Sequence, residues 1–210
     1  MRQVLLQTAI AVIAIGSGLA AEVQSLDGAW KIATDPANSG KQQKWFVSGP
    51  VAGARDCHVP GVLETTFPGY DGVVWYWKSF AVPQPARGER LLVKFHAVDY
   101  LAEVWVNGKL AGSHEGGETP FSFDVTGLMR VGGEANRLVV RAVNPGLERV
   151  DGMVLHETPH GIKNVPMTVG NFWNPGGIWQ SVEVMRVPAV RVEDVFVTAR
   201  RSDRAIRAQV

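Results

Sequence analysis

The feature that most constrains this chain is a series of short apolar–polar alternations separated by turn residues. Residues 103–106 run directly into Asn107-Gly108, and apolar character resumes at Leu110. An Asn-Gly pair between such segments predicts a two-residue hairpin, because both residues accept the positive φ angles of a type I′ turn. Residues 93–98 alternate in the same way, and residues 138–143 and 178–184 are further predicted strands. No long stretch keeps the period of an amphipathic helix. The sequence therefore predicts an all-β fold, an antiparallel sandwich or barrel.

Length and composition agree with one domain of sandwich size. The chain has 210 residues, of which 46% are hydrophobic and 20% charged, so a substantial core is possible. The formal net charge is only +1, which gives no reason to expect binding to nucleic acid or to a membrane surface. Cys57 is the only cysteine. The fold must therefore be stable without an internal disulfide, and we expect the thiol to be a small buried side chain.

Residues 1–20 have the pattern of a secretory signal peptide. Arg2 precedes an apolar run over residues 4–15, and residues 16–20 (GSGLA) place small side chains where a signal peptidase recognises them. The apolar run is short for a transmembrane span, and an uncleaved N-terminal anchor is the alternative. We expect cleavage after Ala20, which would leave a periplasmic or secreted protein with no membrane attachment.

A second group of strand signals follows residue 188. Residues 192–198 and 206–210 alternate again, after residues 187–190 (VPAV). The last segment stops without a turn, and an unpaired strand edge is a feature that proteins avoid. We therefore expect residues 21–188 to form one sandwich and residues 189–210 to be the first strands of a second domain. The alternative is that this hairpin completes the first sandwich.

Several short strings occur in a characteristic order between residues 24 and 187. They are 26–31 (LDGAWK), 59–61 (VPG), 74–80 (VWYWKSF), 102–108 (AEVWVNG), 112–117 (GSHEGG), 121–126 (FSFDVT) and 171–179 (NFWNPGGIW). Together they resemble the N-terminal sugar-binding domain of glycoside hydrolase family 2, the family of β-galactosidases, β-glucuronidases and β-mannosidases. The resemblance implies a jelly-roll (galactose-binding-domain-like) β-sandwich. In the family an immunoglobulin-like sandwich follows, of which residues 189–210 would be the truncated start, and then a (β/α)₈ barrel with two catalytic glutamates.

The resemblance also indicates where sugar contacts lie. Family members commonly have an aspartate at the position of Asn171, and it hydrogen-bonds sugar hydroxyls. An amide can also bond to hydroxyls but lacks the charge that strengthens such bonds, so sugar affinity and preference should differ here. Trp173 can stack on a sugar face or cap the sandwich edge, and Asn174 can contact the ligand or fix the loop. We predict Asn171, Trp173 and Asn174 as substrate-binding residues.

No catalytic residue and no cofactor is predicted in this chain. Glycoside hydrolysis requires two carboxyl groups, roughly 5 Å apart in retaining enzymes. The acidic candidates lie in predicted loops, outside any string that resembles the family's catalytic motifs: Glu115, Glu118, Asp151 and Glu157. Residues 156–160 (HETPH) spell the zinc-peptidase pattern, which requires a helix with both histidines on one face. Pro159 is incompatible with the interior of such a helix, so we predict no metal site.

The remaining conspicuous residues are expected to have structural roles, with one exception. Tryptophans on alternating strands should fill the core: Trp30, Trp75, Trp77, Trp105 and Trp179. His114 is expected to be a structural loop residue, and Asp124 should form a turn with Thr126. The exception is segment 145–169, which is long and polar for a sandwich loop. Because long loops are often functional, a substrate-facing or partner-facing role is one hypothesis for it.

Three functions are consistent with these observations. The preferred one is the N-terminal sugar-binding portion of a secreted family 2 glycoside hydrolase, which would not be active alone because the barrel is missing. The alternatives are a stand-alone carbohydrate-binding module and a structural sandwich used for protein contacts. The preferred function implies two partners, a β-glycoside carbohydrate and the rest of the glycosidase chain, and no nucleic acid.

Overall fold

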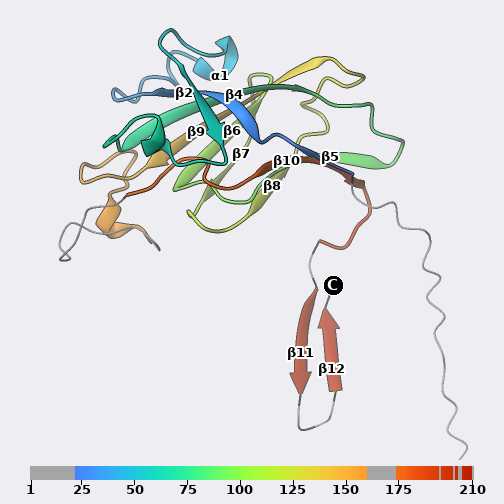
Figure 1. Cartoon of the computed structure of the whole chain (residues 1–210). Coiled ribbons are helices and arrows are strands. Elements are labelled where there is room, and N and C mark those ends of the chain that lie inside the picture. Colours follow the sequence, from blue (N-terminus) through green and yellow to red (C-terminus); the bar gives the residue numbers. More distant parts are fainter. Residues whose placement is uncertain (1–21, 160–173, 194, 201, 203–204, 210) are drawn as a thin grey trace, which may run out of the picture.

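The computed structural model describes residues 22–159, 174–193, 195–200, 202 and 205–209 (Figure 1). Signal residues 1–20 and the predicted contacts Asn171 and Trp173 lie outside the described residues. The described chain forms two antiparallel sheets packed as a sandwich and a separate two-stranded hairpin. The predicted all-β jelly-roll sandwich is thereby confirmed.

The larger sheet has six strands. In hydrogen-bonded order they are β3 (Arg55–Val59), β2 (Gly28–Thr34), β4 (Gly72–Ala81), β9 (Ala135–Asn144), β6 (Leu101–Val106) and β7 (Lys109–Glu115). The smaller sheet has four strands, in the order β1 (Glu22–Ser25), β10 (Val182–Pro188), β5 (Glu89–Phe95) and β8 (Phe121–Asp124). In the described part of the chain, three short helical segments lie between the strands: α1 (Trp45–Ser48), η1 (Leu63–Thr65) and η2 (Leu155–Glu157).

The local turn predictions are confirmed. Asn107 and Gly108 have φ angles of 52° and 80° and connect β6 to β7, as a type I′ turn requires. The Asn107 side chain also donates to the carbonyl of Leu128 at 2.8 Å, so it fixes a second loop. Asp124 accepts hydrogen bonds from the backbone N–H and the hydroxyl of Thr126, at 3.0 and 2.6 Å.

The main core lies between the two sheets. Inward-facing side chains of β4 and β6 meet those of β5 and β10, and all of the following are at most 3% exposed: Val74, Tyr76, Val104, Val106, Val93, Phe95, Val182 and Val184. Trp30 belongs to this core, and half-buried Cys57 packs against it. Burial, together with the charge of Asp56, raises the pKa of the Cys57 thiol to about 12.

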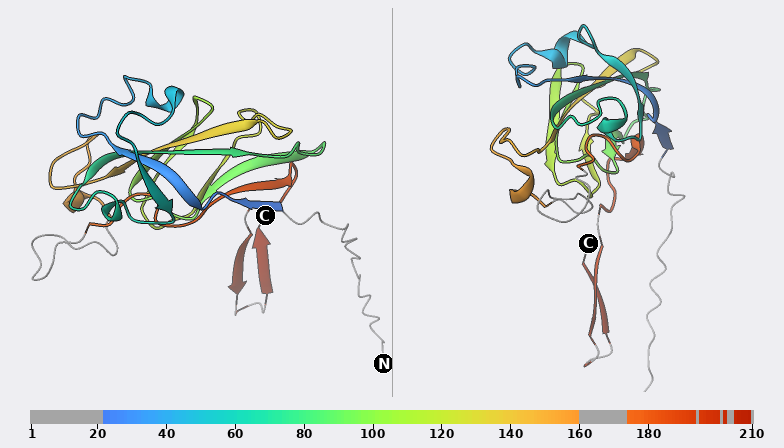
Figure 2. Two further views of the ribbon diagram at one scale, coloured as in Figure 1. Left: turned by 45° about the horizontal axis from the view of Figure 1, so that its top comes forward. Right: turned by 60° about the vertical axis from the view of Figure 1, so that its left-hand side comes forward.

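A second apolar cluster covers the opposite, outer face of the six-stranded sheet. Trp75, Trp77 and Trp105 are at most 6% exposed there. Trp45 and Phe46, from α1, pack on top of them, and the ring centroids of Phe46 and Trp105 are 5.2 Å apart. Figure 2 shows the segment that includes α1 lying over this face. Five tryptophans were expected in the sandwich core, but the structure places only Trp30 there, Trp75, Trp77 and Trp105 in the outer cluster, and Trp179 in neither.

A buried arginine lies beside the outer cluster. Arg141 of β9 has a fully buried side chain and pairs with Glu103 at 2.7 Å and with Asp151 at 2.5 Å. It also donates to the Asn38 side chain at 2.6 Å. A buried guanidinium requires such partners, because an unpaired charge away from water is costly. This network ties two loops to the centre of the sheet.

One strand prediction is wrong. The alternation over residues 178–184 predicts a strand there, but β10 begins only at Val182. The carbonyl of Ile178 accepts instead from the N–H of Gly61. Gly177 exchanges hydrogen bonds with Asp99. These residues therefore connect loops at the end of the sandwich rather than extending the ladder of β10.

The hairpin after the sandwich consists of β11 (Phe196–Arg200) and β12 (Ala205–Gln209), which pair only with each other among the described strands. It projects away from the sandwich (Figure 1). Phe196 and Ile206 are 62% and 77% exposed. Its assignment to a second, immunoglobulin-like domain over residues 189–210 stays a prediction. Within the described residues, no helix has the length and apolar character needed to cross a membrane.

The Arg141 network predicts a loss of stability in acid. Burial raises the pKa of the Asp151 carboxyl, but hydrogen bonds from Arg141 and Asn38 lower it more, so the pKa lies below its usual value. A depressed folded-state pKa contributes stability that is present above the unfolded-state pKa of about 3.9. The contribution is lost as the pH falls through the lower folded-state pKa.

We therefore expect Asp151→Asn to lower the free energy of unfolding at neutral pH by about 1–3 kcal/mol, the range for hydrogen bonds to charged groups. The difference from the parent chain should shrink as the pH falls below about 4. Urea unfolding at several pH values measures this. Asp56→Asn is the control, because its ion pair with Lys31 is exposed and should contribute less than about 1 kcal/mol. Equal effects of the two variants at all pH values would contradict the prediction.

Candidate functional site

Residues 174–181 lie at the end of the sandwich where β4 begins and β9 ends. Gly72, the first residue of β4, pairs with Asn144, the last residue of β9. The Asn144 side chain donates to the carbonyl of Asn174 at 3.0 Å. Asn174 is therefore the one predicted sugar contact that the structure describes, and it lies directly after Asn171 and Trp173 in the sequence.

Asn174 fixes the loop from within. Its side chain is 6% exposed, and its amide nitrogen donates to the carbonyl of Pro145 at 2.9 Å. Its side-chain oxygen is buried and has no hydrogen-bond partner among the described residues. Of the two roles considered for Asn174, these contacts support the loop-fixing one, and direct sugar binding stays a prediction.

Two glycines allow this loop to pack closely against the sheets. A Cβ atom on Gly176 would lie 2.3 Å from the side-chain carbon of Asn144. One on Gly177 would lie 2.1 Å from the Tyr76 hydroxyl oxygen, and Gly177 also has a φ angle of 90°. Neither contact leaves room for a side chain. The glycines in NFWNPGGIW therefore have a steric reason, which the sequence alone did not reveal.

The same loop joins a second family string in space. Asp99 and Gly177 donate backbone hydrogen bonds to each other's carbonyls, both at 2.9 Å. The Trp179 indole donates to the carbonyl of Gly117, in GSHEGG, at 2.7 Å. Trp179 is only partly buried and lies before β10. The prediction that it is a core residue on a strand is therefore wrong. Its indole N–H instead locks two loops together.

Acidic side chains at this end accept hydrogen bonds from the protein itself. Glu64 of η1 accepts from the N–H of Gly176 at 3.4 Å, and Glu115 accepts from the Tyr100 hydroxyl at 3.0 Å. Burial, with the hydrogen bond to Glu115, raises the pKa of Tyr100 to about 12. Tyr100 therefore stays protonated and remains a donor at neutral pH. Glu115 has a structural contact in the arrangement described.

His114 also has structural contacts. Its ring stacks on Phe121 with centroids 4.2 Å apart, and its Nε2 lies 2.9 Å from the Thr119 hydroxyl oxygen. Burial lowers the pKa of His114, so the ring is predominantly neutral at neutral pH. These contacts agree with the expected structural role, but His114 lies on β7 and not in a loop as predicted.

The HETPH segment does not continue as a helix. His156 and Glu157 end the single turn of η2, and Thr158 is extended with φ −106° and ψ 146°. Glu157 forms an exposed ion pair with Arg149 at 2.7 Å, and His160 lies outside the described residues. Among the residues that the structure describes, no group of three or more potential ligand side chains could hold a metal ion.

Part of segment 145–169 covers the outer face of the large sheet. Val150 and Met153 bridge to each other and pack against the tryptophan cluster, while Asp151 pairs with Arg141. Residues 160–169 lie outside the described part of the chain. The described part has a packing role, and a substrate-facing role for the segment stays a hypothesis.

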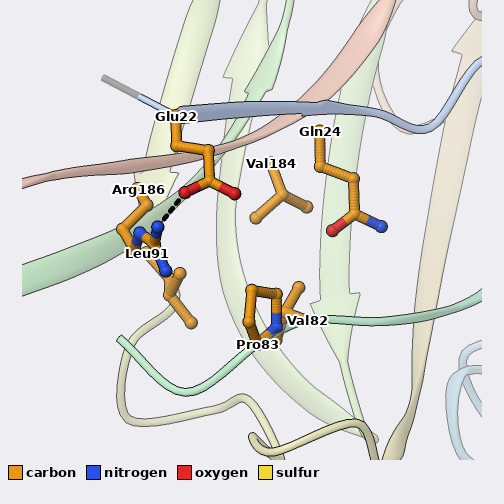
Figure 3. Close-up of a pocket in the computed structure, with 7 residues that line it drawn as sticks. All are labelled: Glu22, Gln24, Val82, Pro83, Leu91, Val184 and Arg186. Carbon is orange, nitrogen blue, oxygen red and sulfur yellow. Dashed lines mark hydrogen bonds and ion pairs between the residues drawn. The ribbon is translucent and has the colours of Figure 1, made fainter. Parts of the chain in front are cut away.

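The pocket in Figure 3 is too small to bind a sugar. Glu22 and Arg186 form an ion pair at its mouth, and Val82, Pro83 and Leu91 line it. Its volume is about 20 Å³, which is close to the space needed by one water molecule. It also lies near the start of β1 and the end of β10, away from Asn174.

The packing of the loop predicts that Gly176→Ala destabilises the protein. The added Cβ would displace the buried Asn144 side chain, and such overpacking usually costs about 1–3 kcal/mol. The midpoint of urea unfolding should fall accordingly. Gly127→Ala is a matched control, because nothing lies within 4 Å of its new Cβ. Equal midpoints for the two variants would show that the loop does not pack as described.

Comparison with known proteins agrees with this architecture. Residues 55–188 match the model of the family described as glycosyl hydrolases family 2, sugar binding domain. The β-glucuronidase of Paenibacillus borealis is 28% identical over 193 residues, covering 86% of this chain and 32% of that protein. The β-glucuronidase of Rattus norvegicus is 28% identical over 203 residues, covering 84% and 30%.

A solved structure shows the same fold. The β-glucuronidase of an uncultured Clostridium sp. superposes with a TM-score of 0.69 at 27% identity, covering 91% of this chain and 34% of that one. The chain thus spans about a third of the length of the relatives it matches. Because the family model covers more than half of its residues, the chain belongs to glycoside hydrolase family 2, whose sugar-binding domain it contains.

Proposed function

We propose that this chain is the sugar-binding part of a secreted family 2 glycoside hydrolase that cleaves β-glucuronides or related β-glycosides with retention. The observation that carries the proposal is its similarity to β-glucuronidases over 84–86% of its length. The match covers only about a third of the length of those enzymes. Assigning their activity to the protein that contains this chain is therefore a proposal.

Catalysis in this proposal belongs to another part of the protein. A (β/α)₈ barrel typically takes about 250 residues, which is more than this chain contains in total. The sandwich would form one wall of the active site, and the barrel would supply the two catalytic carboxyl groups. The chain alone would then hydrolyse no glycoside and would bind monosaccharide glycosides weakly, because most of the contacts are missing.

Asn171, Trp173 and Asn174 are the proposed contacts to the sugar. The hydrogen bond of Asn174 to Pro145 and the close packing of Gly176 and Gly177 support this assignment. A loop that is held in place can present neighbouring side chains to a ligand at little entropic cost. An asparagine at position 171 would contribute neutral hydrogen bonds to sugar hydroxyls.

Secretion is a further part of the proposal and follows from residues 1–20. The exported protein should begin at Ala21, which N-terminal sequencing of the periplasmic or culture fraction would check.

The kinetic test uses the complete hydrolase that we propose contains this chain. Asn171→Ala should raise the KM for a chromogenic β-glucuronide by about 2- to 10-fold, because one or two neutral hydrogen bonds are lost. Gln84→Ala is the control, since Gln84 is exposed on a loop away from Asn174. An unchanged KM would remove Asn171 from the site. Turnover of a glycoside by the 210-residue chain alone would contradict the proposal that catalysis lies elsewhere. Micromolar binding of a glucuronide by this chain would favour a stand-alone carbohydrate-binding module.

A further inference from the structure

Two adjoining hollows lie on the outer face of the six-stranded sheet, beside α1. Their volumes are about 280 and 290 Å³, and they share Ser79 and Arg137. Small exposed side chains form the floor, namely Ala29, Ser79 and Ala135. We call the combined depression the basic groove and define it by these three residues with Lys31, Lys78, Arg130 and Arg137.

The basic groove carries an excess of positive charge. Four cations line it, Lys31, Lys78, Arg130 and Arg137, against one carboxylate, Asp56, so the local net charge is +4 − 1 = +3. The net charge of the whole chain is only +1. The positive charge of the groove is therefore a local feature and not a consequence of overall composition.

Three of these cations remain available to a ligand. The fourth, Lys78, already donates from its ammonium to the carbonyls of Asp27 and Ala29, at 3.4 and 2.9 Å. Lys31 and Asp56 pair at 2.9 Å, but their side chains are 45% and 81% exposed, so the pair is weak. Arg137 donates one N–H to the carbonyl of Val47 at 2.8 Å, which orients its guanidinium and leaves other N–H groups. Among the described residues, no ion pair joins a carboxylate to Arg130 or Arg137.

The groove is distinct from the candidate site at the other end of the sheet. Gly72 begins β4 next to Asn144, which contacts Asn174. Ser79 lies seven residues further along the same strand, which corresponds to roughly 23 Å. A ligand in the groove would therefore lie away from Asn174.

The chemistry of the groove favours an acidic glycan. Arginine side chains present planar pairs of N–H groups that match carboxylates and sulfates. Lys31 is on β2 and Arg137 on β9, with β4 between them, and their partners on β4 are two residues apart. Two strand spacings combined with this offset place their backbones roughly 12 Å apart. That is comparable with the length of a disaccharide, so both could meet acidic groups on one chain. Nucleic acid normally requires a wider basic surface.

We propose that the basic groove binds a glycan chain bearing carboxylate or sulfate groups, as a second subsite about one sandwich length from the candidate site. The choice of a glycan rests on the proposed function. The groove would hold a polymeric acidic substrate while its end reaches the active site.

Calorimetric titration of the purified chain tests this proposal with three probes of similar length: an oligogalacturonate, a dextran sulfate and neutral dextran. An acidic probe should bind, with an affinity that falls as NaCl is added, because exposed charges are screened. In Arg130→Gln/Arg137→Gln its Kd should rise about tenfold or more, since two charge-assisted contacts are lost. Arg87→Gln, which removes an exposed cation outside the groove, should leave the Kd unchanged. The two acidic probes distinguish carboxylate from sulfate recognition.

A variant with the opposite expected effect guards against misfolding of the double variant. Asp56→Asn removes the one carboxylate and frees Lys31, so it should tighten binding of the acidic probe about two- to fivefold. Equal binding of neutral dextran, or an unchanged Kd in both groove variants, would overturn the proposal. So would tighter binding of a DNA duplex, which would assign the groove to nucleic acid.

Asn171→Ala separates this proposal from the proposed function. It should not change the Kd of the acidic probe, because the groove is at the other end of the sheet. Loss of binding in Asn171→Ala but not in the groove variants would overturn the second subsite and support the candidate site. Loss in the groove variants alone supports the subsite, whatever the kinetic test of Asn171 shows.

Discussion

The central strands β4 and β9 bury side chains on both faces of the six-stranded sheet, and much of the remaining structure follows from this. One face meets the four-stranded sheet in the usual way of a sandwich. The other face carries the tryptophan cluster, which would expose a large apolar surface if it were left uncovered. It also carries the buried Arg141, which needs carboxylate partners. The segment around α1 and the turn at residues 150–153 must therefore lie over it. The described residues of these two segments are thus held by packing and by charge pairing.

The family strings have mainly structural roles in this arrangement. Gly117 and Gly177 come from separate strings, and both lie against residues that tie the loops to the sheets. Asn174 is buried between the end of β9 and the backbone at Pro145. A ligand that binds to an ordered loop does not have to supply the free energy of ordering it. Several residues of the strings that resemble the family therefore serve to hold this loop in place.

The two ends of the large sheet differ in chemistry. The end near Asn174 is a dense set of neutral and acidic groups that hydrogen-bond to one another. The end near Arg137 is open, shallow and positively charged. The large sheet is therefore chemically asymmetric along its strands.

The sequence by itself determined the features that depend on neighbouring residues. The all-β class, the Asn107-Gly108 turn, the Asp124 turn and the family resemblance all follow from short strings, because φ preferences and local hydrogen bonds act over a few residues. Only the tertiary structure decided which face each tryptophan occupies, that residues 178–181 leave the strand, and that Arg141 meets Asp151. It also assembled the basic groove from β2, β4 and β9. These features depend on strand order and on the register between residues far apart in the chain. Alternation within one strand shows that the strand has two different faces, but it does not show which segment will cover each face.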